Sequence, residues 1–286
     1  LGRYPLRGLP EPIRLFELEA PGLEAPFASL STRRLIGRSP PTPSTSFVGR
    51  EGDLRTVANA LEQNAIVTLC GVGGVGKTRL AFEVAARAEE LDGGVWFAML
   101  APVDSERVVH AVAAGVGAVP RRDQPVEHAI VEQLEGRAAL IVLDNCEHCI
   151  ETCARLTRSL TAALPALRVL ATSREPLGVA GEVVHHVRPL AAPESVESAR
   201  ESAAVALFVE RACAAREDFT LGSDNLAAVS NLCSRLDGIP LALEMAAARM
   251  RSMSARDLLS RLDERFRLLR GRRGDSEIHH QSLEAS

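Results

Sequence analysis

Residues 71–78 read GVGGVGKT, and this stretch decides how the rest of the chain is interpreted. It fits the pattern GxxxxGK(S/T). It follows a short apolar run at 65–70 and opens a predicted helix at 77–91, the setting in which this pattern forms a phosphate-binding loop. Four glycines let the backbone approach a pyrophosphate closely: Gly71, Gly73, Gly74 and Gly76. The alternative is a glycine-rich turn that holds no ligand.

The residues that end this loop supply the charge and the hydroxyl that a nucleotide site needs. The loop N–H groups and the start of the helix form a cradle for phosphate oxygens. Lys77, the only lysine in the chain, can reach the β- and γ-phosphates, and the Thr78 hydroxyl can bind Mg²⁺. The sequence therefore predicts that a nucleotide and Mg²⁺ bind at 71–78.

A carboxylate follows another apolar run, ALIVLD at 139–144. We expect Asp144 to lie on a strand neighbouring the loop and to organise Mg²⁺; the alternative is an Asp that caps the next helix. Asn145 follows, at a position where many ATP-hydrolysing proteins with such a loop have a second acid that positions water. Glu147 or His148 could take that role, and the sequence assigns it to neither.

A third candidate group is Arg174, which follows the apolar run at 167–171. At a strand end it could contact the γ-phosphate. It could equally be a surface arginine that pairs with Glu175 or Glu182.

The order of patterns predicts an α/β fold in which helices cover both faces of a parallel sheet, followed by a small all-helical domain. Short apolar runs, expected to be strands buried on both faces, alternate with helical patterns. After residue 190 only helical patterns remain. The runs lie at 65–70, 95–100, 139–143, 167–171 and 183–187, and the helices at 50–63, 77–91, 105–117, 125–135, 148–164, 198–216, 224–236, 239–250 and 254–269.

Composition excludes several classes of protein. The 286 residues carry a net charge of −4 and a pI near 6.0, so the whole chain has no general attraction for nucleic acid or for anionic membranes. No apolar run approaches 18 residues, and no signal sequence is visible, so a cytoplasmic protein is expected. Cys146, Cys149 and Cys153 beside His148 invite a zinc interpretation. No second ligand pair follows, which favours ordinary thiols.

Five motifs in order give the chain a family resemblance: FVGRE (47–51), GVGGVGKT (71–78), LIVLDNCEH (140–148), LATSREPLG (170–178) and GIPLALE (238–244). Together they resemble the NB-ARC-type signal-transduction ATPases with numerous domains, and in particular the ATPase module of actinobacterial LuxR-type, cyclase-linked transcriptional regulators. The resemblance covers about residues 45–284 and implies a P-loop NTPase that binds ATP or ADP. By the same resemblance Arg50 lies near the nucleotide, Arg174 senses the γ-phosphate, and Pro240 packs toward the adenine.

The two ends of the chain resemble other domains. Residues 1–22 carry a hairpin-like alternation and are similar to the end of a class III nucleotidyl cyclase domain, although no cyclase active-site residue is present. A Pro- and Ser-rich linker is expected at 23–46, the P-loop domain at 47–190 and the helical domain at 191–270. Residues 271–286 resemble the lead into a winged-helix domain that the sequence lacks. The basic stretch before and within this tail fits a solvated helix end better than a DNA contact, so direct DNA binding is not expected; it consists of Arg265, Arg267, Arg270, Arg272 and Arg273.

Three functions fit these features. The first is an ATP/ADP switch with slow Mg²⁺-dependent hydrolysis, coupled to domain rearrangement in a transcriptional-regulator-type protein and to protein partners, attached regulatory domains or an ATP-dependent oligomer. The second is a non-hydrolysing module locked with ADP or serving as a scaffold. The third is a fragment without activity of its own, since the chain begins with Leu rather than Met.

Overall fold

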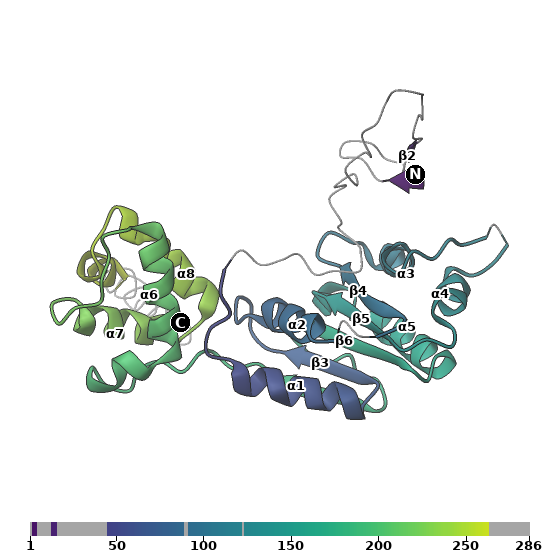
Figure 1. The fold of residues 1–286 in the computed structure, drawn as a ribbon, viewed down its shortest axis with the longest axis horizontal. Coiled ribbons are helices and arrows are strands. Elements are labelled where there is room, and N and C mark those ends of the chain that lie inside the picture. The colour runs from purple at the N-terminus through teal and green to yellow at the C-terminus, as the bar shows by residue number, and fades with distance from the viewer. Residues whose placement is uncertain (1, 5–12, 16–44, 89–90, 122, 263–286) are drawn as a thin grey trace, which may run out of the picture.

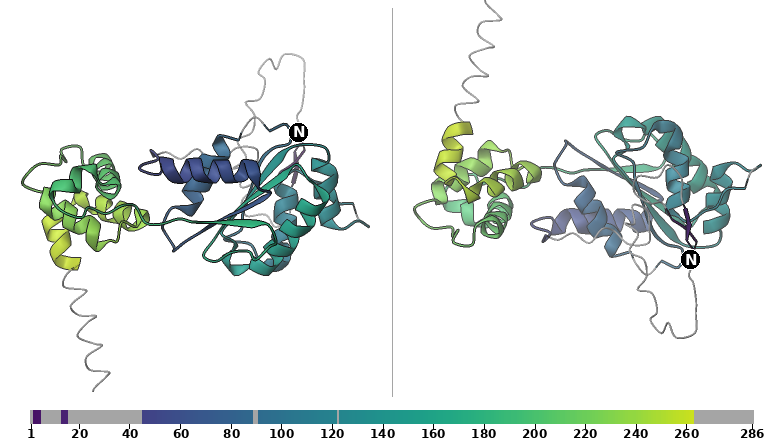
Figure 2. Two further views of the ribbon diagram at one scale, coloured as in Figure 1. Left: turned by 90° about the horizontal axis from the view of Figure 1, so that it is seen from below. Right: turned by 90° about the horizontal axis from the view of Figure 1, so that it is seen from above.

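The computed structural model describes residues 2–4, 13–15, 45–88, 91–121 and 123–262 (Figure 1). Within them a sheet with flanking helices lies at one end of the molecule and a helical bundle at the other, as both views of Figure 2 show. The connection between the two parts runs through residues 187–193, which form no helix or strand.

The sheet has five parallel strands in the order β4-β5-β6-β3-β7. All five predicted strands are confirmed, and so is the α/β fold class. The bounds are Ile66–Cys70 for β3, Gly94–Met99 for β4, Ala139–Asp144 for β5, Leu167–Ser173 for β6 and Glu182–His186 for β7. Every residue of β3 and β5 is buried, as expected for strands covered on both faces.

Helices cover both faces because successive strand side chains point in opposite directions. In β5, Leu140 and Val142 pack with α1 and α2, whereas Ile141 and Leu143 pack with α3, α4 and α5. The bounds are Glu51–Gln63 for α1, Lys77–Ala86 for α2, Val108–Gly115 for α3, Val126–Leu134 for α4 and Ile150–Ala163 for α5, with short 3₁₀ turns η1 at Ser105–Arg107 and η2 at Cys146–His148.

Two features of the sheet differ from the sequence prediction. Strand β6 lies between β3 and β5, so Asp144 is not on the strand next to the phosphate-binding loop. Strand β7 is an edge strand, and most of its side chains are only partly buried, because it pairs with β3 alone. Its His185 ring lies 3.0 Å from the Asp53 carboxylate of α1.

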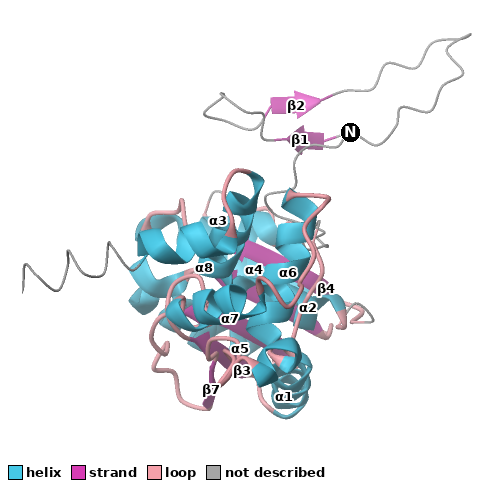
Figure 3. Cartoon of the chain, turned by 90° about the vertical axis from the view of Figure 1, so that its left-hand side faces the viewer, coloured by secondary structure: helices cyan, strands magenta, loops and turns pink. Residues whose placement is uncertain are grey.

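The second part is helical, as predicted, and has its own core around Phe208, Val229, Leu232 and Leu243. Helix α6 packs against both α7 and α8. Figure 3, viewed from this end, shows these helices in front of the sheet. The bounds are Glu197–Glu201 for η3, Ala203–Ala215 for α6, Leu226–Arg235 for α7, Pro240–Ala248 for α8 and Arg249–Arg251 for η4. A further helical stretch begins at residue 255 and continues to the last described residue, 262.

Near the N-terminus, β1 (Gly2–Tyr4) and β2 (Ile13–Leu15) pair antiparallel, which confirms the predicted hairpin-like pattern. The predicted linker at 23–46 lies almost wholly outside the described residues, and the tail at 271–286 lies wholly outside them. The likeness to a cyclase end stays a prediction. None of the helices in the described part combines the length and apolarity needed to cross a bilayer.

Candidate functional site

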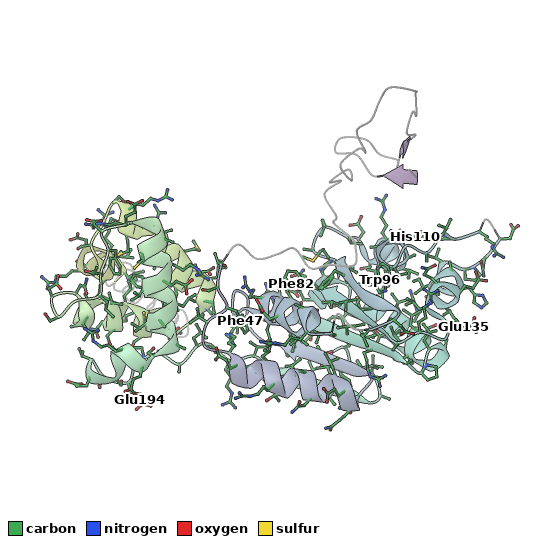
Figure 4. All side chains as sticks on the ribbon, in the orientation of Figure 1. Phe47, Phe82, Trp96, His110, Glu135 and Glu194 are labelled. Atoms are coloured by element: carbon green, nitrogen blue, oxygen red, sulfur yellow. The ribbon has the colours of Figure 1, made fainter. Side chains whose placement is uncertain are left out.

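A cavity of about 780 Å³ opens where the carboxyl ends of the strands face the helical part. Its size falls in the range of small-molecule sites. The sheet part lines it with residues of the phosphate-binding loop, Glu147 and Arg174, and the helical part lines it with Pro240 and Leu241. Phe47, on the segment that enters the sheet domain, also lines it, and Figure 4 places this residue at the junction of the two parts.

Of the four loop glycines that were predicted to allow positive φ, Gly74 and Gly76 adopt it and Gly71 and Gly73 do not. Gly74 and Gly76 have φ values of +75° and +99°, in the left-handed region that favours glycine. Among the described residues, no acceptor satisfies the backbone N–H groups of Gly73, Gly74 and Gly76. These unpaired donors at the start of α2 form a cradle suited to an anion.

Lys77 is the cation of this cradle and is only 9% exposed. Its Nζ donates hydrogen bonds to the carbonyl oxygens of Gly71 (2.8 Å) and Val72 (3.1 Å). Burial lowers the pKa of the Lys77 ammonium, and the nearby Glu147 carboxylate opposes that shift. The ammonium is therefore held inside the loop by two carbonyl groups.

Asp144 is buried and belongs to a small network of hydroxyl groups. Its Oδ1 accepts hydrogen bonds from Thr78 Oγ1 and from Thr172 Oγ1, both at 2.7 Å. Thr172 Oγ1 in turn accepts a hydrogen bond from the Asn145 N–H at 2.9 Å. Asp144 caps no helix, since Asn145 and Cys149 precede η2 and α5. Thr172, near the end of the intervening strand β6, thus holds Asp144 together with Thr78, and the sequence alone did not indicate this role.

Arg174 lies at the end of β6 and faces the cavity. It pairs with Glu147, whose Oε1 is 3.2 Å from the arginine Nε, and not with Glu175 or Glu182. Glu182 instead accepts hydrogen bonds from the backbone N–H groups of residues 177–179. Arg174 is 68% exposed, so this ion pair holds it weakly and leaves it accessible to a ligand.

Arg50 lines the cavity but contacts the protein on three sides. Its guanidinium donates to the carbonyl oxygens of Val75 (2.6 Å) and Arg188 (3.0 Å) and pairs with Asp53 (3.0 Å). Only 5% of the residue is exposed. Arg50 therefore braces the phosphate-binding loop against the segment that leaves β7.

The helical part contacts the loop directly. The N–H of Leu241, in the first turn of α8, donates to the carbonyl oxygen of Gly74 at 3.1 Å. Pro240 occupies the first position of α8, where its missing N–H leaves no hydrogen bond unmade, and it lies close to Gly76. A side chain added at Gly74 would come within 2.8 Å of Leu241 Cβ.

The cysteine cluster behind Asp144 is made of buried thiols. The sulfur atoms of Cys149 and Cys153 are 3.6 Å apart, and Cys146 bonds to a backbone carbonyl. His148 Nε2 lies 2.9 Å from the Val103 carbonyl oxygen. In the part of the chain that the structure describes, no three His, Cys, Asp or Glu side chains are arranged to hold a metal ion.

The residues present fit a nucleotide with Mg²⁺. Unpaired N–H groups and Lys77 provide the chemistry for phosphate oxygens. Thr78 and Asp144 provide adjacent oxygen atoms, and Mg²⁺ in nucleotide sites typically takes one or two such protein ligands while the phosphates and water supply the rest. Both groups would sit at the carboxyl end of the sheet, where open α/β sheets bind ligands.

This fold and this loop define a P-loop NTPase. The particular family follows from sequence comparison, since residues 50–217 match the NB-ARC domain. The chain belongs to the NB-ARC family and is a nucleotide-binding module of the kind found in signalling proteins.

Two of its relatives are regulators by name. The chain is 45% identical over 229 residues to a "Putative HTH-type transcriptional regulator" of Mycobacterium tuberculosis, which covers 79% of this chain and 25% of the relative. It is 28% identical over 291 residues to "Regulatory protein AfsR" of Streptomyces coelicolor, covering 92% of this chain and 27% of that protein. The chain thus spans about a quarter of the length of these relatives.

Among solved structures, the Walker-type ATPase of Pyrococcus abyssi aligns with a TM-score of 0.55 at 15% identity, over 87% of this chain and 81% of that one. At this identity the likeness concerns the fold alone, and it supports the P-loop NTPase architecture described above.

Proposed function

We propose that this chain is the ATP/ADP-operated switch of a larger regulatory protein. It binds ATP or ADP with Mg²⁺ and hydrolyses ATP slowly. The nucleotide that is bound sets the position of the helical part relative to the sheet part. Family membership supports the nucleotide, and the names of the relatives support a regulatory role. Signal input, oligomer formation and output would belong to partners or attached domains.

The positions of the residues in and beside the cavity support the following roles. Lys77 and the loop N–H groups would bind the β- and γ-phosphates, and Thr78 and Asp144 would hold Mg²⁺, which lowers the charge on the phosphates. Arg174 would contact the γ-phosphate, since it is exposed in the cavity. Pro240 would line the adenine side, while Arg50 would act mainly by bracing the loop.

The hydrogen bond from the Leu241 N–H to the Gly74 carbonyl oxygen is the observation that carries the switch proposal. It ties the helical part to the loop that would surround the phosphates. A change in that loop would therefore be felt at the start of α8, and nucleotide identity could set the relation of the two parts. A ligand shifts such an equilibrium only through a difference in its affinity for the two arrangements.

Hydrogen exchange tests the switch directly. Peptides that cover 71–78 and 239–251 are compared with ADP·Mg²⁺ and with a non-hydrolysable ATP analogue. The proposal predicts protection of 71–78 with both nucleotides and a different degree of protection at 239–251 between the two. Equal protection at 239–251 would reject the switch while leaving nucleotide binding intact.

The ion pair between Glu147 and Arg174 and the Asn145 that follows Asp144 favour a second candidate, an ADP-bound module without turnover. Phosphate release separates the two candidates. Release by the wild-type chain no faster than by an Asp144→Ala variant would favour the module without turnover.

A further inference from the structure

Glu147 is a carboxylate inside the cavity that the roles above do not use. Strand β5 ends at Asp144, and Asn145 then takes a left-handed conformation with φ +68°. The η2 turn follows, with Cys146 fully buried on the core side. Glu147 therefore points the other way and lines the cavity together with Lys77 and Thr78.

The two oxygen atoms of Glu147 differ in their surroundings. Oε1 is 3.2 Å from Arg174 Nε. Oε2 is buried and has no hydrogen-bond partner among the described residues. A buried carboxylate oxygen without a donor is unfavourable, and inside a polar cavity the simplest donor is a water molecule.

The neighbouring candidates for a proton acceptor are already engaged. Asp144 Oδ1 already accepts hydrogen bonds from the Thr78 and Thr172 hydroxyl groups. The His148 ring lies against the Val103 carbonyl oxygen. Glu244, the other carboxylate that lines the cavity, pairs with Arg211 of α6 at 3.1 Å. The two alternatives that the sequence left open, Glu147 and His148, are thus separated by position.

We propose that Glu147 accepts the proton of the attacking water in ATP hydrolysis, and that Arg174 holds Glu147 back until a γ-phosphate draws the guanidinium away. This inference rests on the proposed function. The water oxygen forms a bond to the γ-phosphorus, and the bond from that phosphorus to the bridging oxygen breaks with its electron pair left on ADP. The water proton passes to Glu147 and then to solvent, so ATP and water give ADP, phosphate and a proton.

Such a pair would allow a chain with Asn145 in place of a second acid to hydrolyse ATP slowly. Without a γ-phosphate, Arg174 pairs with Glu147 Oε1 and occupies one side of the carboxylate. With a γ-phosphate present, the guanidinium has a more highly charged partner, and Glu147 is released beside it. Hydrolysis would then depend on the exchange of one ion pair for another.

Glu147→Gln gives opposite effects on two measured quantities. General-base groups contribute about 100-fold or more to a rate, so turnover at saturating ATP should fall by about that factor. ATP should bind at least about threefold more tightly, because the substitution frees Arg174 and removes a negative charge facing the γ-phosphate. ADP affinity should stay within about twofold, since ADP lacks that phosphate. Glu151→Gln, the same change at an exposed position on α5, should alter none of these values.

Glu147→Asp serves as the second variant in case the amide disturbs folding, and it should keep part of the turnover because it retains a carboxylate. The proposal is overturned if wild-type turnover is no faster than that of Glu147→Gln. It is also overturned if the substitution weakens ATP and ADP binding alike. Absence of any saturable ATP binding by the folded wild-type chain would instead reject the proposed function, and the role of Glu147 with it.

Discussion

Replacing Arg50 with alanine removes the brace behind the phosphate-binding loop. The guanidinium is 5% exposed, and it donates to the carbonyl oxygens of Val75 and Arg188 while pairing with Asp53. An alanine side chain replaces none of these contacts. Two carbonyl groups lose a charged donor, and the loop loses its connection to the segment that follows β7.

The expected loss of stability follows from those contacts. A hydrogen bond to a charged group contributes about 1.5–3 kcal/mol net, so the two carbonyl bonds together contribute about 3–6 kcal/mol. Water from the cavity that Arg50 lines can replace part of this, and we expect a net loss of about 2–4 kcal/mol. With a urea m-value of about 2–3 kcal/mol/M, the unfolding midpoint should fall by about 1 M.

Urea unfolding followed by tryptophan fluorescence measures this loss. The chain has one tryptophan, Trp96 in β4, so the signal reports on the sheet part. Arg216→Ala is the matched control, because Arg216 is exposed and pairs with Asp218 in water, and its midpoint should not change measurably. A fall below about 0.3 M for Arg50→Ala, less than one ordinary hydrogen bond, would refute the bracing role.

Three further outcomes are expected. Gly74→Ala should lower the unfolding midpoint more than Gly117→Ala, because only a side chain at Gly74 would meet Leu241 Cβ, at 2.8 Å, while both glycines have φ above +70°. Equal losses in the two variants would contradict the close contact between Gly74 and Leu241. Burial raises the pKa of the Cys70 thiol to about 11, so its contribution to stability is present below pH 9 and is lost as the pH rises toward 11. The unfolding midpoint of the wild-type chain should therefore fall more steeply between pH 9 and pH 11 than that of Cys70→Ala, and parallel curves would count against the raised pKa. A lysine-directed reagent should modify only Lys77 and the α-amino group, and mass spectrometry should show that bound ATP protects Lys77. An equal extent of Lys77 modification with and without ATP would contradict the placement of the nucleotide at Lys77.

The parts of this structure that the sequence predicts are those set by local pattern. The loop at 71–78, the buried strands and the end of β5 at Asp144 follow from short runs of residues, and the structure has them where expected. A glycine-rich loop between a strand and a helix also fixes where phosphates can bind. The residues of the loop that would contact phosphate can therefore largely be predicted from the local sequence.

The parts that it does not predict depend on the order of the strands. Because β6 lies next to β5, Thr172 of β6 reaches Asp144 at the end of β5, and no spacing along the chain predicts this contact. The pairing of Arg174 with Glu147 likewise needs the left-handed turn at Asn145. A polar residue at the end of each central strand, here the threonine in ATSR at 171–174, is the one signal that could have pointed to the network.

The bracing role of Arg50 was hidden for a related reason. Its two carbonyl partners lie 25 and 138 positions away in the chain. The motif around Arg50 suggested a place near the nucleotide, and the structure adds that the guanidinium is already occupied by the protein. Distant partners of this kind emerge only once the fold brings them together.

Calorimetric titration of the folded chain with ATP and ADP, each with Mg²⁺, measures whether the phosphate-binding loop holds a nucleotide. We expect saturable binding at one site per chain, and loss of that binding in a Lys77→Ala variant whose Trp96 fluorescence still reports a folded sheet. Failure of the folded wild-type chain to bind either nucleotide, or unchanged affinity in Lys77→Ala, would contradict this expectation.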